Sequence, residues 1–295
     1  MTDLLDRLHI ALAERYAVER ELGRGGTAIV FLARDLPEGH LVALKVLRPE
    51  VASVVGTERF LREIRLATRL QHPHIVRLIE AGQTQDFLYY SMPYIAGESL
   101  RARLWREAEL PIEEALGITS QVADALAYAH GEGVIHRDIK PENLLLSGGH
   151  VFVTDFGISR ALDAAGGSAL TQTGFVLGTP AYISPEQAAG EGHLDGRCDL
   201  YSLGVVLFEM LAGAQPFIAA TRQQVVAMRF LKPPPLLPAG RDDVPEALAV
   251  LVHRMLAILP ADRFASAREL IAALKSVPLA QPAPLPASRA RQPSA

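Results

Sequence analysis

The chain has 295 residues, of which 49% are hydrophobic, and its formal net charge is -4 at pH 7. This length is enough to bury a large apolar core in one or two domains. The negative charge gives no electrostatic basis for binding nucleic acid, and no apolar run approaches the roughly 20 residues of a membrane helix. Cys198 is the only cysteine, so no disulfide forms within the chain. The first residues lack the features of a signal peptide, and we expect a cytoplasmic protein.

The opening residues, 1–15, predict an N-terminal amphipathic extension. Leu4, Leu5, Leu8 and Leu12 recur at helical spacing within the stretch Asp3–Arg15. Docking to a partner is one role for this apolar stripe. Packing against the domain that follows is the role that we expect.

The next part of the chain has the pattern of a small sheet with one helix. Short β-branched or alternating runs predict strands, and one stretch between them has helical spacing. The predicted strands are Ile29–Arg34, Leu41–Leu47, Ile75–Ile79 and Phe87–Ser91, and the predicted helix is Thr57–Leu70.

Beyond Gly97 the spacing of apolar residues becomes mainly helical. The predicted helices are Ile112–His130, Gly196–Leu211, Pro245–Ile258 and Ser266–Lys275. After Ser276 the sequence consists mostly of Pro, Ala, Ser and Arg and has almost no large apolar side chain. Such a segment cannot repay the entropy of ordering, which predicts a disordered tail or linker over residues 277–295.

Two short runs in the second half carry the strongest chemical signal. The run His136-Arg137-Asp138-Ile139-Lys140-Pro141-Glu142-Asn143 is followed, after a strand-like stretch, by Asp155-Phe156-Gly157. Isolated Asp and Asn residues beside Gly or Pro are usually turn formers. In this order and spacing they supply a carboxylate that can orient a hydroxyl and oxygen ligands for a hard cation such as Mg²⁺. The grouping is typical of phosphoryl transfer.

A glycine-rich loop near the N-terminus is the second chemical element, with the sequence Leu22-Gly23-Arg24-Gly25-Gly26-Thr27-Ala28-Ile29-Val30. Glycines let backbone N–H groups approach phosphate oxygens, although the loop alone is a weak signal and a plain hairpin turn is the alternative. Strand-like residues follow the glycines, which argues against a dinucleotide-binding turn, because that turn opens a helix.

Lys45 lies in the apolar run Val42-Ala43-Leu44-Lys45 on the next predicted strand. A buried ammonium group needs an anionic partner. Phosphate oxygens and the carboxylate of Glu63, on the predicted helix, are the candidates. Taken alone, Glu63 is an ordinary solvated helix charge, so only the pair is informative.

Taken together, these motifs resemble those of the eukaryotic-like (Hanks-type) bacterial serine/threonine protein kinases. The resemblance covers about residues 16–276 and extends to Ser184-Pro185-Glu186, Asp199 and Arg263. It implies an α+β, bilobal protein-kinase fold with a small, mainly-β N-lobe that carries one long helix (16–92). A hinge (93–97) and a larger, mainly-α C-lobe (98–276) follow. Ala28 stands for the third loop glycine and Ser184 for the usual alanine, and neither change removes a ligand.

The resemblance implies catalytic and cofactor roles. Asp138 accepts or orients the substrate hydroxyl, Lys140 neutralises charge near the transferred group, and Lys45 holds phosphates and pairs with Glu63. Asn143 and Asp155 bind Mg²⁺ or Mn²⁺, and ATP is the phosphoryl donor. The implied nucleotide-binding residues are Leu22, Gly23, Arg24, Gly25, Gly26, Thr27, Ala28, Val30, Ala43, Lys45, Met92, Pro93, Ile95 and Leu145.

The resemblance also assigns structural roles. Glu186 and Arg263 form a buried ion pair, and Asp199 anchors the catalytic loop. His136 is expected to be a packed support beside Phe156 and to take no part in acid–base chemistry.

The segment between Gly157 and Ser184 is expected to control activity. Autophosphorylation is predicted at Thr171 or Thr173, and the guanidinium of Arg137 is suited to receive the phosphate. By resemblance, Thr179 contacts the catalytic Asp and Lys and marks an enzyme that modifies Ser or Thr.

These features predict a protein kinase whose partners are proteins with Ser or Thr acceptors, including itself through autophosphorylation. The resemblance also allows a homodimer. The predictions include no nucleic acid partner and no membrane segment, with a membrane tether only if the native protein continues past residue 295. A nucleotide-binding pseudokinase scaffold is the alternative, although Lys45, Asp138 and Asp155 are all present. A kinase of small molecules would lack the Ser184-Pro185-Glu186 run.

Overall fold

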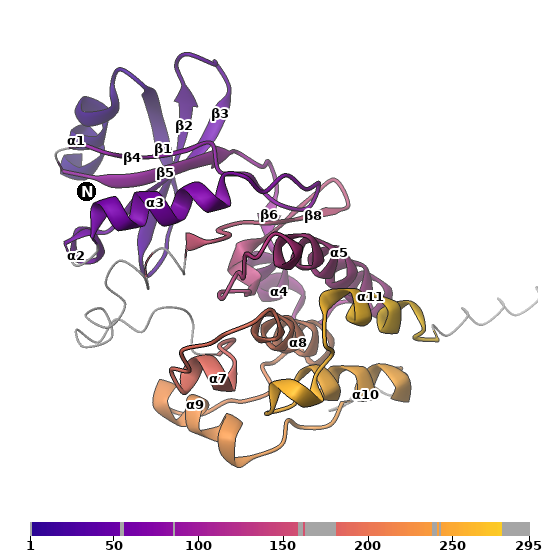
Figure 1. Cartoon of the computed structure of the whole chain (residues 1–295). Helices are drawn as coiled ribbons and strands as arrows, with labels where there is room; N and C mark the ends of the chain where they lie inside the picture. Colours follow the sequence, from indigo (N-terminus) through magenta and orange to yellow (C-terminus); the bar gives the residue numbers. More distant parts are fainter. Residues whose placement is uncertain are drawn as a thin grey trace, which may run out of the picture.

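The computed structural model describes residues 2–53, 56–84, 86–158, 162, 181–237, 241 and 243–278. They form a small lobe built on a five-stranded antiparallel sheet and a larger lobe built mainly of helices (Figure 1). The fold is therefore α+β and bilobal, as the sequence predicts. Within these residues, no helix combines the length and apolar character needed to cross a membrane.

The sheet of the N-lobe has the strand order β1-β2-β3-β5-β4. Its strands are β1 (Tyr16–Arg24), β2 (Ala28–Asp35), β3 (Leu41–Leu47), β4 (Glu80–Gln83) and β5 (Leu88–Pro93). The register sets Val30 opposite Lys45 on β2 and β3, and Ala43 opposite Met92 on β3 and β5. Residues of the predicted nucleotide site are thus aligned across neighbouring strands.

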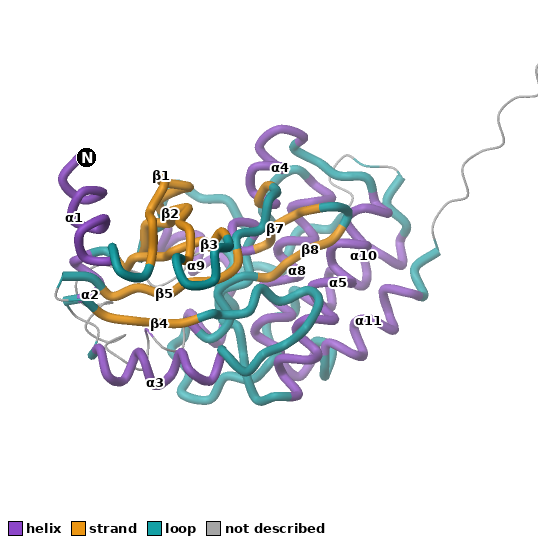
Figure 2. Tube along the Cα trace, turned by 90° about the horizontal axis from the view of Figure 1, so that it is seen from above, coloured by secondary structure: helices purple, strands orange, loops and turns teal. Residues whose placement is uncertain are grey.

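Helices pack on both faces of this sheet, because side chains alternate along each strand. On one face, α1 (Thr2–Leu12) buries Leu8 and Leu12 in the cluster that contains Tyr89. On the other face, α2 (Pro49–Ala52) and α3 (Thr57–Ala67) pack in the cluster that contains Tyr90. Figure 2 shows α1 and α3 on different sides of the sheet. The N-terminal extension therefore packs on the N-lobe, and its helix ends at Leu12, before the predicted end at Arg15.

One predicted strand is wrong. The run Ile75–Ile79 forms only an isolated bridge, between Ile75 and Val153, and the fourth strand occupies Glu80–Gln83 instead. The N–H of Val76 donates to the carbonyl of Val153 at 2.9 Å, so this apolar run is tied to a strand of the C-lobe. Its side chains are apolar because they fill the two cores and not because they belong to the sheet.

A three-stranded sheet of order β6-β7-β8 begins the C-lobe. Its strands are β6 (Glu98–Ser99), β7 (Leu144–Ser147) and β8 (His150–Val153). The chain enters this sheet through Gly97, where a Cβ atom would collide with the carbonyl oxygen of Leu146. The hydroxyl of Ser147 donates to the carbonyl of Ala96 at 2.6 Å. These contacts fix the connection between the lobes.

The helices of the C-lobe pack around α8 (Arg197–Ala212), in which every residue from Cys198 to Leu211 is buried. Gly204 lets α8 approach α10 (Glu246–Met255) closely, since a Cβ there would lie 2.7 Å from the Cβ of Met255. α5 (Ile112–Gly131) packs against both α8 and α11 (Ala267–Lys275). The other helices are α4 (Leu100–Glu107), α5 (Ile112–Gly131), α7 (Pro185–Ala188), α9 (Arg222–Leu231), α10 (Glu246–Met255) and α11 (Ala267–Lys275), with 3₁₀ turns η1 (Pro141–Asn143) and η2 (Pro260–Asp262).

The C-terminal boundary differs by one residue from the predicted one. Val277 is 9% exposed and packs in the C-lobe core, so the packed domain reaches past Ser276. Residues 279–295, which make up most of the predicted tail, lie outside the described residues.

Candidate active site

The loop of residues 136–143 follows α5 and is anchored by Asp199 from the first turn of α8. The fully buried carboxylate of Asp199 accepts hydrogen bonds from the backbone N–H groups of His136 at 2.9 Å and Arg137 at 2.7 Å. His130 Nε2 lies 2.8 Å from the same carboxylate. Burial opposes ionisation of Asp199, but the hydrogen bonds and charge of His130 and His136 hold its pKa below the usual value. An ionised carboxylate therefore fixes the loop backbone.

The side chains of Asp138, Lys140 and Asn143 converge within this loop. Lys140 Nζ lies 2.6 Å from Asp138 Oδ2. Asn143 Nδ2 donates to the backbone oxygen of Asp138 at 2.8 Å and to its Oδ2 at 3.1 Å. Because these bonds use the amide nitrogen of Asn143, its amide oxygen remains the acceptor for a cation.

Asp155 lies two residues after the end of β8, and side chains from the N-lobe sheet hold its carboxylate. Lys45 Nζ is 2.5 Å from its Oδ2, and the hydroxyl of Tyr90 donates to its Oδ1 at 3.2 Å. Burial raises the pKa of Asp155, but the Lys45 ammonium outweighs that effect and holds it below the usual value. The backbone of Asp155 has φ of 68°, a left-handed conformation that is uncommon for a residue other than glycine.

Backbone contacts bring Asn143 and Asp155 together. The N–H of Thr154, one residue before Asp155, donates to the carbonyl of Asn143 at 2.9 Å. The two side chains offer carboxylate and amide oxygens, which are the ligands that Mg²⁺ prefers. The residues present therefore fit a hard divalent cation.

His136 supports this arrangement from the core. It is fully buried, its Nε2 lies 2.8 Å from the carbonyl oxygen of Thr154, and its ring meets Phe156 edge-on with centroids 4.5 Å apart. The structure thus places it as a packed support, as expected.

The predicted purine-binding residues come from strands of both lobes. Val30 and Ala43 lie on β2 and β3, Met92 lies near the end of β5, and Leu145 lies on β7. Ala43 and Ile95 pack against the cluster that contains Met92. The predicted purine site therefore combines side chains from the N-lobe sheet with one from the small sheet of the C-lobe.

The glycine-rich loop is the hairpin between β1 and β2. Gly23 and Arg24 pair with Val30 and Ile29, and the N–H of Gly25 donates to the carbonyl of Ala28 at 2.8 Å. A strand and not a helix follows the glycines, in agreement with the argument against a dinucleotide turn. The side chain of Arg24 makes two hydrogen bonds of 2.7 Å to Glu21.

A buried ion pair joins α7 to the end of the C-lobe. Arg263 Nη1 and Nη2 donate to the two carboxylate oxygens of Glu186 at 2.7 and 2.8 Å. Arg263 also donates to the carbonyls of Arg197, Ala257 and Ile258. The guanidinium group of Arg263 thus binds the Glu186 carboxylate and three backbone carbonyl oxygens. The ion pair is therefore part of the structural framework of the C-lobe.

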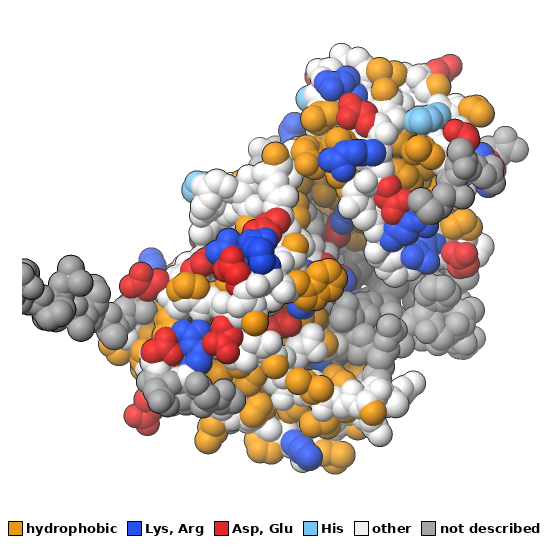
Figure 3. Space-filling view, turned by 180° about the vertical axis from the view of Figure 1, so that it is seen from behind, with side chains coloured by type: hydrophobic (Ala, Val, Ile, Leu, Met, Phe, Trp, Pro, Cys, Tyr) orange, Lys and Arg blue, Asp and Glu red, His pale blue; other side chains and the backbone are white. Residues whose placement is uncertain are grey.

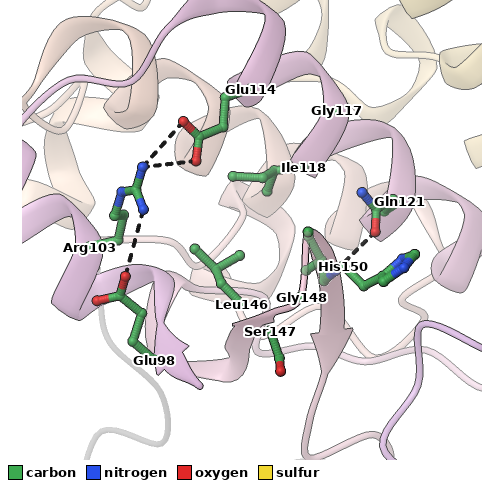
Figure 4. A pocket seen from close by; sticks show the side chains of 12 residues that line it. Glu98, Arg103, Glu114, Gly117, Ile118, Gln121, Leu146, Ser147, Gly148 and His150 are labelled. Atoms are coloured by element: carbon green, nitrogen blue, oxygen red, sulfur yellow. Dashed lines mark hydrogen bonds and ion pairs between the residues drawn. The ribbon is translucent and has the colours of Figure 1, made fainter. Parts of the chain in front are cut away.

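A separate cavity of about 370 Å³ lies in the C-lobe, between α5 and the small sheet (Figure 4). In it, Arg103 points toward Glu98 at 3.8 Å and Glu114 at 3.3 Å. None of the predicted catalytic, metal-binding or purine-binding residues that the structure describes lines this cavity.

Charges of both signs are intermixed on the face drawn in Figure 3. Elsewhere in the structure, ion pairs at the surface join Arg106 to Glu98 at 2.7 Å and Arg34 to Glu19 at 3.4 Å. The net charge of -4 is not gathered into one patch on this face.

Several predicted residues have no described geometry. Thr171, Thr173 and Thr179 lie outside the described residues, and so does the side chain of Glu63, although its backbone belongs to α3. The pairing of Lys45 with Glu63 stays a prediction. Among the residues whose side chains the structure describes, Lys45 pairs with Asp155.

Sequence reasoning missed Tyr90. A tyrosine within a buried strand was the available signal, because a buried hydroxyl needs a hydrogen-bond partner.

Comparison with known proteins defines the class of this chain. A model of the protein kinase domain matches residues 16–274. The chain is 42% identical over 276 residues to the serine/threonine-protein kinase pkn3 of Myxococcus xanthus, covering 90% of this chain and 50% of that protein. It is 43% identical over 264 residues to PknJ of Mycobacterium tuberculosis, with 86% and 44% covered. For PrkC of Bacillus subtilis the identity is 36% over 267 residues, with 90% and 41% covered.

The chain therefore belongs to the protein kinase domain family. Within this family it is similar to bacterial serine/threonine-protein kinases, which confirms the resemblance drawn from its motifs. The chain spans about half, or less, of the length of these relatives.

Proposed function

We propose that this chain is an ATP-dependent protein kinase that transfers the γ-phosphoryl group to serine and threonine hydroxyls of proteins. The observation that carries the proposal is the joint geometry of Asp138, Lys140 and Asn143 on one loop, with the Asp155–Lys45 pair beside it. Membership of the protein kinase family and the names of the relatives support it.

Asp138 accepts or orients the proton of the acceptor hydroxyl in this proposal. Lys140, 2.6 Å from Asp138, keeps that carboxylate in place and puts a positive charge beside the transferred group. Lys45 brings a second positive charge from β3 toward the phosphates. Positioning and charge stabilisation supply most of the rate enhancement in phosphoryl transfer.

Asn143 and Asp155 are the proposed ligands of Mg²⁺ or Mn²⁺. When bound, the cation neutralises phosphate charge. Asn143 presents its amide oxygen because its nitrogen is engaged with Asp138, and Asp155 is held ionised by Lys45.

The nucleotide site proposed here lies where the lobes meet. Val30, Ala43 and Leu145 enclose the purine, with Met92 behind it. The carbonyl of Pro93 and the N–H of Ile95 face the adenine edge. Backbone N–H groups of the loop 22–28 approach the phosphates.

Regulation by autophosphorylation at Thr171 or Thr173 is part of the proposal. Arg137 immediately precedes Asp138, and a guanidinium group is suited to bidentate binding of a phosphate. Its backbone is fixed, since its N–H donates to Asp199 and its carbonyl accepts from Gln187 Nε2 at 2.9 Å. Phosphopeptide mapping of active enzyme is expected to find one of these threonines modified, and a map with neither modified would exclude this control.

Transfer of labelled phosphate from γ-labelled ATP to a protein acceptor tests the main proposal. Asp138→Asn is expected to lower kcat by about 10²–10⁴-fold, because the exchange removes the group that accepts the proton. Asp124→Asn on α5, where the carboxylate is 57% exposed, is the matched control and keeps full activity.

A pseudokinase gives a different result in the same experiment. The wild-type chain then binds nucleotide with Mg²⁺ or Mn²⁺ but transfers no phosphate, and Asp138→Asn changes nothing. A kinase of small molecules transfers phosphate to such a compound and not to protein.

A further inference from the structure

Tyr90 lies at the back of the predicted nucleotide site, on β5 and two residues before Met92. Its side chain is 3% exposed and packs in the cluster that contains Phe60 and Ile64 of α3. On the neighbouring strand β3, the residue in register with Tyr90 is Lys45. A buried tyrosine hydroxyl needs a hydrogen-bond partner, and here that partner is Asp155.

Tyr90 and Lys45 hold the two oxygens of one carboxylate. The Tyr90 hydroxyl donates to Asp155 Oδ1 at 3.2 Å, and Lys45 Nζ lies 2.5 Å from Oδ2. An ionised carboxylate has about four lone-pair sites, so one donor on each oxygen leaves a further site on each for a cation.

The backbone of Asp155 has φ of 68°, an uncommon conformation that persists only where the surrounding structure holds it. The hydrogen bond from Tyr90 and the contact with Lys45 are part of that surrounding structure.

We propose that Tyr90 is a positioning residue for Asp155, and that its hydroxyl holds the carboxylate in the orientation in which it meets the divalent cation of a bound nucleotide. This inference rests on the proposed function, because it assigns a role within the same site. Groups that hydrogen-bond to a metal ligand orient that ligand and strengthen metal binding.

Tyr89 provides a matched control on the same strand. It points to the opposite face of the sheet, where its ring meets Tyr16 edge-on with centroids 6.1 Å apart. Tyr89→Phe removes the same atom as Tyr90→Phe, one residue away, without touching Asp155. Both tyrosines are buried, with 8% and 3% exposure, so the two exchanges are comparable in their effect on packing.

The test is calorimetric binding of a non-hydrolysable ATP analogue to the full chain, with and without Mg²⁺. Without Mg²⁺, the wild type, Tyr90→Phe and Tyr89→Phe are expected to bind equally. With Mg²⁺, Tyr90→Phe is expected to bind about tenfold more weakly, and its half-saturating Mg²⁺ concentration in phosphate transfer to rise by about the same factor. Tyr89→Phe matches the wild type in both.

Two results overturn the inference while leaving the proposed function intact. In one, Tyr90→Phe binds the analogue as the wild type does at every Mg²⁺ concentration. In the other, it loses affinity equally with and without Mg²⁺, which is the signature of a packing defect. If the wild type itself shows no Mg²⁺-dependent binding, the proposed function fails, and the inference fails with it.

Discussion

Asp199 is the residue on which the geometry of the catalytic loop depends most. It is fully buried and binds the backbone of His136 and Arg137, just before Asp138. Asp199→Asn replaces one acceptor oxygen by a donor that faces an N–H group. We expect a loss of about 2–3 kcal/mol of folding free energy and, since the loop is displaced, a fall of about 10²-fold in kcat.

The pH dependence of this loss follows from the lowered pKa of Asp199 in the folded chain. Its contribution to stability is complete above the pKa of an unfolded Asp, about 3.9, and is lost as pH falls through the lower folded value. Urea unfolding is expected to show a constant difference between wild type and Asp199→Asn from pH 7 to pH 5, which shrinks below about pH 4. A difference that grows with acidity contradicts this assignment.

The sequence predicted which residues form the candidate site, but it did not predict their contacts. Asp138, Lys140 and Asn143 lie within one short loop, so their proximity follows from spacing. Lys45 and Asp155 are 110 positions apart, and only the meeting of the two lobes brings them together. The apolar residues around Lys45 predicted that its ammonium group has an anionic partner, but they did not identify that partner.

Among the elements, α7 depends on the ion pair between Glu186 and Arg263. Arg263→Lys keeps the charge but cannot make the two parallel bonds to Glu186, nor donate to the carbonyls that surround it. Because both side chains are at most 5% exposed, we expect destabilisation of about 3 kcal/mol in thermal or chemical unfolding. The same exchange at Arg34, in a surface pair that is 48% and 39% exposed, is expected to cost under about 1 kcal/mol.

The helix α1 offers a test of whether the N-terminal extension belongs to the N-lobe. Leu8 is fully buried and Ile10, on the same helix, is 81% exposed. Leu8→Ala is expected to destabilise the chain by about 3 kcal/mol, through lost burial and the cavity that remains. Ile10→Ala is expected to change stability by no more than about 0.5 kcal/mol. Equal effects in unfolding experiments would show that the helix does not pack as described.

The prediction of helices and strands succeeded where the periodic spacing of apolar residues extends over many residues. It failed where tertiary contacts determine the conformation of a segment. The long helix α5 starts at the predicted Ile112 and ends one residue past the predicted end. The run Ile75–Ile79 has strand composition, yet it serves the cores of both lobes. The short helix α9 had a signal that was overlooked, a capping box in which Thr221 and Gln224 bond each other's backbone.

At the scale of the whole molecule, the two lobes are joined at the hinge and by contacts such as Lys45–Asp155 and Tyr90–Asp155. The N-lobe delivers Lys45 and Tyr90 from one sheet, and the C-lobe delivers Asp138 and Asn143 from one anchored loop. The proposed chemistry therefore requires both lobes. The curated relatives are about twice as long as this chain or longer.

The measurement that tests the central claim most directly is the identity of the product formed on a protein acceptor incubated with the purified chain, Mg²⁺ and γ-labelled ATP. The wild type is expected to yield labelled phosphoserine and phosphothreonine, and Asp138→Asn is expected to yield neither above background. Label on tyrosine, no label on protein with the wild type, or equal label with Asp138→Asn would contradict the account.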